Sequence, residues 1–310
     1  MNQFKNILLI GPTDKRVVAQ AVELLTNRQS KMTLLSLAPS LEEAKIEAEP
    51  GKIVDLQLLL EKELIDDLSS TAAPFQDEGV RIRTKVVCAT HPFVEVIRQV
   101  VNQKHDLVMM LADGVGGLRE QLFGTLSMHL MRKCPCPVWV VKPSRRTRLR
   151  NVFAAVDPDP NEPDAVREQL NIEILSRATT IAQNHSAKLH VIHAWTTLGD
   201  QVTRSRRWMS KTEIRLHIEK VADRHRTMLN RLLADHSDGS PTLHMLQGRP
   251  GQVIPETISQ HKGDLLVMGT VCRTGIPGFF IGNTAETILS QVDCSVLTVK
   301  PNEFVSPVRL

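Results

Sequence analysis

The chain has 310 residues, of which 42% are hydrophobic and 23% are charged, and its formal net charge is +4. This composition is typical of a globular protein and excludes a fibrous or highly charged disordered chain. No apolar run approaches the roughly 20 residues that a membrane-spanning helix needs, and residues 1–7 lack the pattern of a secretory signal. Five cysteines without disulfide-framework spacing suit a reducing compartment. We therefore expect a cytoplasmic protein with no membrane span.

An internal repeat determines the domain organisation. The sequence of residues 264–268, DLLVM, repeats that of residues 106–110, DLVMM, and Gly282 repeats Gly124 at the same spacing. Both copies end in a short apolar run followed by Lys-Pro. A gapless register over this length indicates two copies of one domain.

The boundary between the copies is marked by an arginine-rich stretch. Residues 144–150 read SRRTRLR, and the apolar run that follows restarts the pattern of residues 6–10. We expect a first domain over residues 1–143, this stretch as a solvated linker, and a second domain over residues 151–310. Extra residues of the second copy are expected around residues 196–212.

In both copies, short apolar runs alternate with helical patterns, and the second copy shows this most clearly. The expected strands of the second copy are residues 151–156, 188–194, 242–246, 265–268 and 295–299. The expected helices are residues 164–185, 212–235, 251–260 and 283–291. Apolar strands that alternate with helices indicate parallel βαβ units covered on both faces. The predicted fold class is α/β, with two tandem, doubly wound, open parallel sheets of five strands each.

Open parallel sheets bind ligands beyond the carboxyl ends of their strands, where the strand order reverses. In the second copy this places the loop that starts at Asp157 opposite the loop that starts at Gly269. Glycines in the second loop let backbone N–H groups approach an anion, and Arg273 is suited to pair with phosphate. Asn283 and Thr284 are expected to cap the next helix, whose N-terminus favours negative charge. The alternative is a long loop in which glycine and proline only form turns, but its position favours phosphate binding.

The same loop carries a family resemblance. The runs GTV at residues 269–271, RTG at residues 273–275 and GNTAE at residues 282–286 resemble the universal stress protein family, as do the closing VKP at residues 299–301 and the tail FVSPV at residues 304–308. The resemblance covers nearly the whole chain and is strongest to the E-type subgroup with two fused domains. It implies a Rossmann-like fold of the adenine nucleotide alpha hydrolase type.

Nucleotide-binding members of the family carry glycine, two residues, glycine, nine residues, then glycine followed by Ser or Thr. Here Gly269 and Gly282 match, whereas Cys272 and Asn283 depart from the pattern. The resemblance assigns contact with the nucleotide to Asp157 and contact with the base to the backbone beside Ala194. The expected ligand-binding residues are Val156, Asp157, Ala194, Met268, Gly269, Thr270, Val271, Cys272, Arg273, Gly282, Asn283, Thr284 and Ala285.

The first copy departs from the pattern in another way. Leu111 stands where the leading glycine is expected, although Gly114 and Gly124 complete the motif. Its first strand ends in Gly11-Pro12-Thr13, without an acid at the position of Asp157. We therefore expect the first site to be closed to ATP.

The cofactor expected for the second site is ATP or AMP, with Mg²⁺. Magnesium usually binds one or two carboxylates together with phosphates, which suits Asp157. Asp159 is instead expected to form a turn and cap the next helix. A metal site of the protein's own is not expected, because His190 and His193 are three residues apart on a strand and point to opposite faces.

The remaining candidate residues are assigned structural roles. Cys134 and Cys136 do not have zinc or thioredoxin spacing and are expected to pack in the core, whereas Cys272 lies in the loop and is a candidate for oxidation. Arginines 204, 206 and 207 add to the positive charge of the linker. Aromatic residues make up only 4% of the chain, so direct nucleic-acid binding is not expected.

Together these patterns predict a binding and regulatory protein that is not an efficient catalyst. The resemblance implies a role in cytoplasmic stress survival, including tolerance of DNA damage. We expect the two halves to form a pseudo-dimer through their last strands, which would otherwise be exposed edges. Two alternatives stay open: ATP binding with slow hydrolysis by the second half, and a lipid-like ligand in an apolar cleft.

Overall fold

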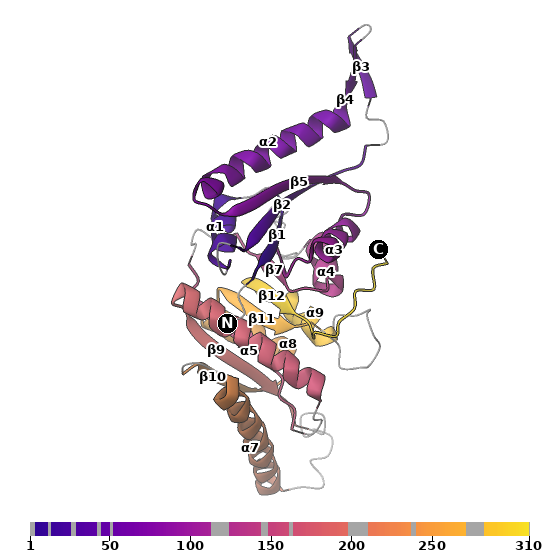
Figure 1. Cartoon of the computed structure of the whole chain (residues 1–310). Coiled ribbons are helices and arrows are strands. Elements are labelled where there is room, and N and C mark those ends of the chain that lie inside the picture. Colours follow the sequence, from indigo (N-terminus) through magenta and orange to yellow (C-terminus); the bar gives the residue numbers. More distant parts are fainter. Residues whose placement is uncertain are drawn as a thin grey trace. The chain divides into compact units, whose positions relative to one another are not determined.

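The chain forms two compact units, which are described separately (Figure 1). The first unit comprises residues 3–147 with the tail 305–310, and the second unit comprises residues 148–304. The computed structural model describes residues 4–11, 14–25, 29–41, 45–49, 52–112, 124–143, 148–160, 164–197, 210–236, 240–270 and 282–309. The tail thus groups with the first unit, although it follows the second in sequence.

The first unit contains a parallel sheet with the strand order β5-β2-β1-β6-β7. The strands are β1 (Asn6–Ile10), β2 (Lys31–Ala38), β5 (Arg81–Cys88), β6 (Leu107–Leu111) and β7 (Val138–Val141). The helices are α1 (Lys15–Glu23), α2 (Leu56–Asp77), α3 (Pro92–Gln103) and α4 (Thr125–Lys133). Helix α2 packs against β2 and β5, while α3 and α4 contact each other (Figure 1). The order reverses between β1 and β6, as in other doubly wound sheets.

The first unit also contains an antiparallel pair of strands that the sequence did not predict. Strands β3 (Lys45–Glu49) and β4 (Lys52–Asp55) pair with each other and lead into α2 (Figure 1). Their sequences, KIEAE and KIVD, are short and rich in charge, so the apolar pattern expected of a strand is weak. The prediction of five strands per half did not include this pair.

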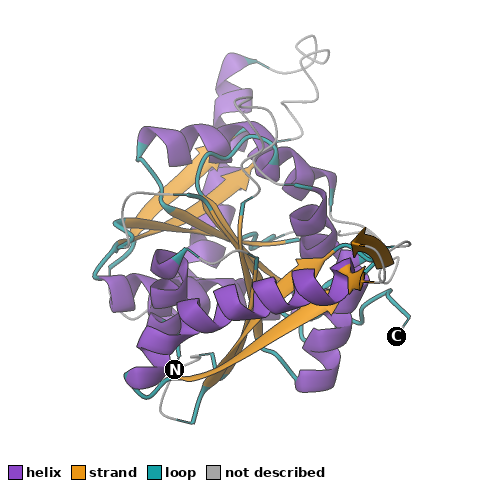
Figure 2. Cartoon of the chain, turned by 90° about the horizontal axis from the view of Figure 1, so that it is seen from above, coloured by secondary structure: helices purple, strands orange, loops and turns teal. Residues whose placement is uncertain are grey.

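The second unit repeats the parallel sheet with the strand order β10-β9-β8-β11-β12. The strands are β8 (Asn151–Ala155), β9 (Lys188–Trp195), β10 (Thr242–Gln247), β11 (Leu265–Gly269) and β12 (Ser295–Val299). The helices are α5 (Ala165–His185), α7 (Lys211–His236), α8 (Pro250–Gln260) and α9 (Asn283–Leu289). Figure 2 shows helices on both sides of the strands. Helix α5 contacts α7, and α8 contacts α9.

Burial of the central strands explains their near-continuous apolar sequences. The side chains of Val152, Phe153 and Ala154 on β8 are fully buried, as are Leu265 and Val267 on β11. A parallel strand with helices on both faces has no solvated side, so the apolar residues do not alternate with polar ones. None of the helices in the described part of the chain is long and apolar enough to cross a membrane.

One aspartate per unit holds the start of the first strand. In the first unit, the carboxylate of Asp106 accepts hydrogen bonds from the backbone N–H groups of Lys5 (2.7 Å) and Asn6 (3.0 Å). In the second unit, Asp264 accepts from the backbone N–H groups of Arg150 (2.7 Å) and of the first residue of β8 (2.9 Å). The sequence repeat is therefore also a repeat of hydrogen bonds.

One asparagine per unit completes the same arrangement, which we call the amino-end clamp. The amide of Asn151 donates to the backbone carbonyls of His261 (3.1 Å) and Lys262 (3.2 Å), just after α8. Asn6 donates in the same way to the carbonyls of the last residue of α3 and of Lys104. Lys104 and Lys262 both have positive φ, 54° and 51°. In each unit the clamp thus connects the start of the first strand to the end of a helix, where the backbone adopts a left-handed conformation at Lys104 or Lys262.

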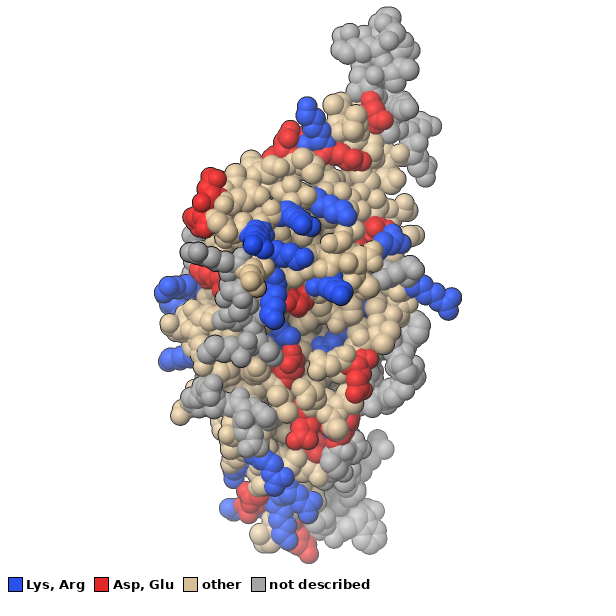
Figure 3. Space-filling view, viewed as in Figure 1, with Lys and Arg blue, Asp and Glu red and all other residues tan. Residues whose placement is uncertain are grey.

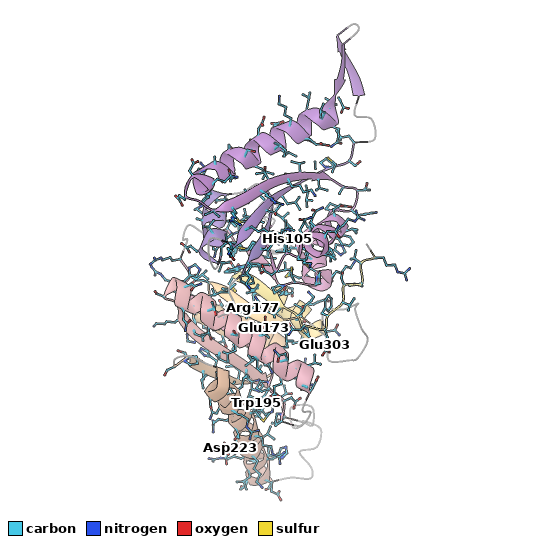
Figure 4. The ribbon with its side chains drawn as sticks, viewed as in Figure 1. His105, Glu173, Arg177, Trp195, Asp223 and Glu303 are labelled. Atoms are coloured by element: carbon cyan, nitrogen blue, oxygen red, sulfur yellow. The ribbon has the colours of Figure 1, made fainter. Side chains whose placement is uncertain are left out.

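The clamp of the second unit is testable by Asp264→Asn. An amide in place of the carboxylate loses the negative charge that strengthens both hydrogen bonds. Its NH2 group can also turn toward one of the two backbone N–H groups, and two donors cannot bond to each other. We expect the second unit to lose about 1.5–3 kcal/mol of unfolding free energy, measured by urea denaturation. The matched control is Asp223→Asn on α7 (Figure 4), whose side chain is 71% exposed and pairs with Arg226. It should change stability by less than about 0.5 kcal/mol, and equal effects of the two changes would contradict a structural role for Asp264.

Candidate functional site

The strand order of the second unit reverses between β8 and β11, which are adjacent and parallel. The chain leaves β8 toward β9 on one side, and it leaves β11 toward β12 on the other. A crevice at the carboxyl ends of these two strands is the general ligand position in such sheets. The structure places Val156 and Asp157 directly after β8, and Thr270 directly after β11. The carboxyl ends of β8 and β11 therefore lie side by side, whereas most of the second predicted loop, residues 271–281, falls outside the described residues.

The loop after β8 is held at three backbone points. The N–H group of Val156 donates to the carbonyl of Ile192 at 3.0 Å, which extends the pairing of β8 with β9. The N–H group of Asp157 donates to the side-chain oxygen of Asn171 on α5 at 2.8 Å, and Asn171 is buried. The carbonyl of Val156 lies 3.1 Å from Nδ1 of His193. These contacts fix the backbone that presents the carboxylate of Asp157.

A buried histidine pair continues this support into α7. Nε2 of His193 on β9 lies 2.9 Å from Nδ1 of His225 on α7, and the two side chains are 0% and 7% exposed. Trp195 stacks on His225 with a centroid distance of 5.7 Å (Figure 4). Burial lowers the pKa of both imidazoles, while Asp157 and Asp159 act in the opposite direction. The pair is therefore uncharged near neutral pH and links α7 to the loop after β8.

Asp159 has a different role from the one expected. The sequence suggested that it caps the next helix, but the residue that caps α5 is Asp164, whose carboxylate accepts the N–H group of Val166 at 2.9 Å. Asp159 instead forms an ion pair with Arg167, with a closest N···O distance of 3.2 Å. Both side chains are less than a fifth exposed, so this pair also helps to hold the loop after β8.

Gly269 ends β11 against the side chains of α5. A Cβ atom at this position would lie 2.8 Å from Cδ2 of Leu170 and 3.6 Å from Cδ1 of Ile174. Such a contact with Leu170 is shorter than packed side chains tolerate. Glycine at this position therefore avoids a contact to which the side chain of Leu170 would have to yield, independently of any ligand. Any test of binding that replaces Gly269 also changes the packing of α5.

The helix after the glycine loop begins at Asn283, as the sequence predicted, but its N-cap is a different residue from those expected. Gly282 is the N-cap of α9, and Asn283 and Thr284 are its first two residues and are exposed. The prediction that Asn283 and Thr284 cap this helix is therefore wrong, because the carbonyl of Gly282 already accepts the N–H group of Glu286 at 3.0 Å. Gly282 also donates to the carbonyl of Thr270 at 3.2 Å, which brings the two ends of the loop together.

The other predicted site residues are distributed as follows. Met268 and Ala285 are buried, and Ala194 lies near the end of β9 and is half-buried. Val271, Cys272 and Arg273 lie outside the described residues, as does Gly114 of the first half. The extra residues expected around residues 196–212 fall mostly on residues 198–209, which are also outside the described part.

The first unit has a different set of residues at the equivalent edge. Leu111 ends β6, and Gly11 follows β1 with φ +100°. The N–H group of Gly11 donates to the carbonyl of Leu35 at 3.0 Å, as Val156 does to its own neighbour strand. The sheet register places Ser36 where the second unit has His193. The histidine support of the loop is thus confined to the second unit.

A second group of histidines lies at the opposite end of the second sheet. His190 on β9 stacks on Phe153 with a centroid distance of 4.5 Å, and its Nδ1 lies 2.9 Å from Nε2 of His244 on β10. His261, at the end of α8, lies 4.7 Å from the ring of His244. His190 and His193 therefore point to opposite faces, as predicted. Within the described residues, no group of three His, Cys, Asp or Glu side chains has the geometry of a metal site.

A line of basic residues on β5 was not singled out from the sequence. Arg81, Arg83 and Lys85 occupy alternate positions and are exposed. Figure 3 shows Lys and Arg side chains gathered over this part of the first unit. Lys85 donates to Gln99 of α3 at 2.8 Å. Because β5 is an outer strand of its sheet, these charges disfavour pairing of its open edge with another chain.

The fold defines a class of protein: tandem open α/β domains, each with a reversal of strand order, which is where sheets of this kind bind ligands. The model of the universal stress protein family matches residues 4–142 and again residues 149–300. The chain belongs to the universal stress protein family and contains two tandem domains of it.

Curated relatives and solved structures agree with this assignment. Universal stress protein E of Salmonella typhi is 30% identical over 238 residues, covering 76% of this chain and 74% of that protein. The universal stress protein E homolog of Haemophilus influenzae is 22% identical over 97% of this chain and 99% of that protein. The crystal structure of a putative universal stress protein from Pseudomonas aeruginosa UCBPP-PA14 has a TM-score of 0.72 and 24% identity, covering 97% of this chain and 94% of that chain. That structure shares the fold.

The packing role of Gly269 is testable by a double-mutant cycle with Leu170. Gly269→Ala introduces the short contact with Leu170 and should cost about 1–3 kcal/mol of unfolding free energy. In the background of Leu170→Ala the same change should cost much less, because the clashing atoms are gone. Urea denaturation of the four proteins measures the coupling. Equal costs in both backgrounds would show that Gly269 is not constrained by α5.

The histidine group at the opposite end of the sheet predicts a pH dependence of stability. Burial, followed by the nearby His244 and His261, lowers the pKa of His190 from 6.5 to about 4. Between pH 6.5 and pH 4, His190 binds a proton in the unfolded chain but not in the folded one. Its contribution to the free energy of unfolding is therefore fully present above pH 6.5 and is lost as the pH falls toward 4. The loss attributable to His190 should reach at most about 3 kcal/mol, measured as the shift of the urea midpoint.

The control for this pH dependence is a second histidine of the same unit. His190→Gln should flatten the decline in stability between pH 6.5 and pH 4. His217→Gln, on the exposed surface of α7, should leave the decline unchanged. An unchanged pH profile for His190→Gln would show that other groups cause the acid sensitivity.

Proposed function

We propose that the second unit binds an adenine nucleotide, ATP or AMP, at the carboxyl ends of β8 and β11, with Mg²⁺ when the ligand is ATP. One observation carries this proposal. Asp157 stands at the strand-order reversal on a loop whose backbone is held by Asn171 and His193. A preordered loop reduces the entropy that a ligand must overcome on binding.

The remaining residues of the proposed site have distinct roles. Gly269 and Thr270 bring the backbone of β11 to the crevice, and the N-terminus of α9 contributes Gly282, Asn283 and Thr284. Val156 and Ala194 border the side where the family resemblance places the base. Val271, Cys272 and Arg273 complete the phosphate loop by sequence.

In this proposal the protein is a cytoplasmic binding and regulatory module of stress survival, including resistance to DNA-damaging conditions. The described residues near Asp157 place no general base against a nucleophile, so at most slow ATP hydrolysis is expected. The first unit is closed to ATP in this proposal, because Leu111 replaces glycine and no acid stands at the position that matches Asp157. No direct contact with nucleic acid is proposed.

We also propose that the halves associate as a pseudo-dimer through β7 and β12. Within its own unit, β7 pairs with β6 on one side, and β12 pairs with β11 on one side. Each therefore has a second edge that its own unit does not fill. Apolar edge strands are usually covered in soluble proteins, and mutual pairing of these two edges would cover both.

Direct measurement of nucleotide binding tests the proposed site. The purified chain is examined by mass spectrometry for co-purified ATP or AMP and then titrated with each nucleotide and Mg²⁺ by calorimetry. Asp157→Asn should weaken binding about tenfold or more, because a charged contact is lost. Glu303→Gln, at an exposed position in the chain after β12 (Figure 4), is the matched control and should bind as the wild type does.

Two further results separate the alternatives. Cys272→Gly restores the second glycine of the family pattern, so a marked rise in affinity would show a nucleotide pocket that Cys272 partly obstructs. The absence of binding by wild type and by Cys272→Gly at millimolar nucleotide would contradict the proposal. Binding of a fatty acid under those conditions would then favour the lipid-like ligand.

A further inference from the structure

Two cysteine thiols lie in contact in the turn between α4 and β7 of the first unit. The sulfur atoms of Cys134 and Cys136 are 3.6 Å apart. Both side chains are buried, with exposed fractions of 0% and 9%. From the sequence we expected them only to pack in the core, because a spacing of one residue matches neither zinc nor thioredoxin motifs. Spacing alone does not reveal that the two sulfur atoms face each other.

The backbone on either side of the pair is anchored. Cys134 ends α4, and its N–H group donates to the carbonyl of Leu130 at 2.8 Å. On the other side, the carbonyl of Pro137 accepts the N–H group of Val108 on β6 at 3.0 Å. Pro135 lies between the two cysteines and restricts the backbone through its ring. The segment therefore holds both sulfur atoms close together before any reaction.

We propose that Cys134 and Cys136 are a redox pair that a peroxide converts from the dithiol to a disulfide. A disulfide has a sulfur–sulfur distance of about 2.0 Å, so the sulfur atoms must approach by about 1.6 Å.

The reaction has two steps. Cys136, the more exposed of the two, loses its thiol proton and attacks one oxygen of hydrogen peroxide as the thiolate; the O–O bond breaks, giving a sulfenic acid on Cys136, and the departing hydroxide takes up the proton to leave as one water. The sulfur of Cys134 then attacks the sulfur of Cys136; the S–O bond breaks, and the oxygen leaves as a second water with the thiol proton. In total, two thiols lose two electrons and two protons to one peroxide.

The second unit supplies a natural comparison for this pair. Cys294 precedes β12 as Cys136 precedes β7, but Val292 stands at the position of Cys134. Both Val292 and Cys294 are buried. The second unit therefore has the first cysteine of the reaction without the one that completes it. The same turn in the two units differs in the side chain that would close the disulfide.

Cys88, the other described cysteine of the first unit, is poorly suited to compete. Burial, reinforced by Glu61, raises the pKa of Cys88 to about 11. Its sulfur donates to a carboxylate oxygen of Glu61 at 3.1 Å. Since the thiolate is the reactive form, Cys88 reacts slowly near neutral pH.

The proposal is tested on the full chain by treatment with hydrogen peroxide, alkylation of the remaining thiols and peptide mass spectrometry. In the wild type, the peptide that contains Cys134 and Cys136 should escape alkylation and lose the mass of two hydrogen atoms. Dithiothreitol should restore the original mass and the alkylation of both cysteines. Cys88 and Cys294 should remain available for alkylation in the same sample.

Cys134→Val reproduces the arrangement of the second unit and is the matched variant. Treated with peroxide, it should form no disulfide, and Cys136 should instead be trapped as a sulfenic acid by dimedone. Circular dichroism verifies that the variant is folded. Cys136→Ala gives an independent readout. The peptide that contains residue 134 should not lose the mass of two hydrogen atoms in this variant, because Cys134 has no neighbouring thiol with which to form a disulfide.

Three results would overturn the proposal. The first is full alkylation of Cys134 and Cys136 after peroxide treatment of the wild type. The second is a disulfide that joins either of them to another cysteine in preference to its neighbour. The third is loss of two hydrogen atoms in the same peptide of Cys136→Ala. The wild-type measurement decides the question even where a variant does not fold.

Discussion

The amino-end clamp sets the register on which both sheets depend. In each unit one aspartate and one asparagine bind the start of the first strand to the end of a helix, at a residue with positive φ. The first strand is thereby aligned with its neighbour, so that Ile7 lies opposite Leu107 and Val152 lies opposite Leu265. Neighbouring parallel strands have the same rise per residue, so the alignment at their starts also decides which residues lie opposite each other at their carboxyl ends. A shift by one residue would turn the buried side chains of β8 to the wrong face. The residues that meet at one end of the sheet are thus determined by polar contacts at the other.

The sequence alone was sufficient to predict the structural elements that depend on the local spacing of apolar residues. The helix expected over residues 164–185 is α5, Ala165–His185, because apolar spacing along a helix is set by its own geometry. Features that depend on distant partners were not accessible. The contact of His193 with His225 joins β9 to α7, and no spacing rule for neighbours on one element reveals it. The cap of α9 was placed one residue late, because polar side chains after a glycine resemble caps whether or not they serve as such.

Gly269 illustrates why a motif match needs a structural account. The family pattern explains a glycine here by the approach of a phosphate, and the structure supplies a second reason in the side chain of Leu170. The two explanations predict different consequences of substitution, one for affinity and one for stability. In the first unit the larger residue Leu111 occupies the corresponding strand end. The halves therefore differ at this position in the volume of the side chain, whatever either half binds.

The asymmetry between the halves extends to the groups that support the site. Three hydrogen-bonded contacts hold the loop after β8, and they involve Ile192, Asn171 and His193. In the first unit the described residues repeat the contact of Gly11 with the neighbouring strand, while Ser36 replaces the histidine. Buried imidazoles such as His193 and His225 are costly unless each finds a partner, and here each is the other's partner. Such a pair contributes to an ordered loop, and an ordered loop lowers the entropic cost of binding. The second unit has thus retained, beside the acid itself, the buried polar contacts that keep the acid in place.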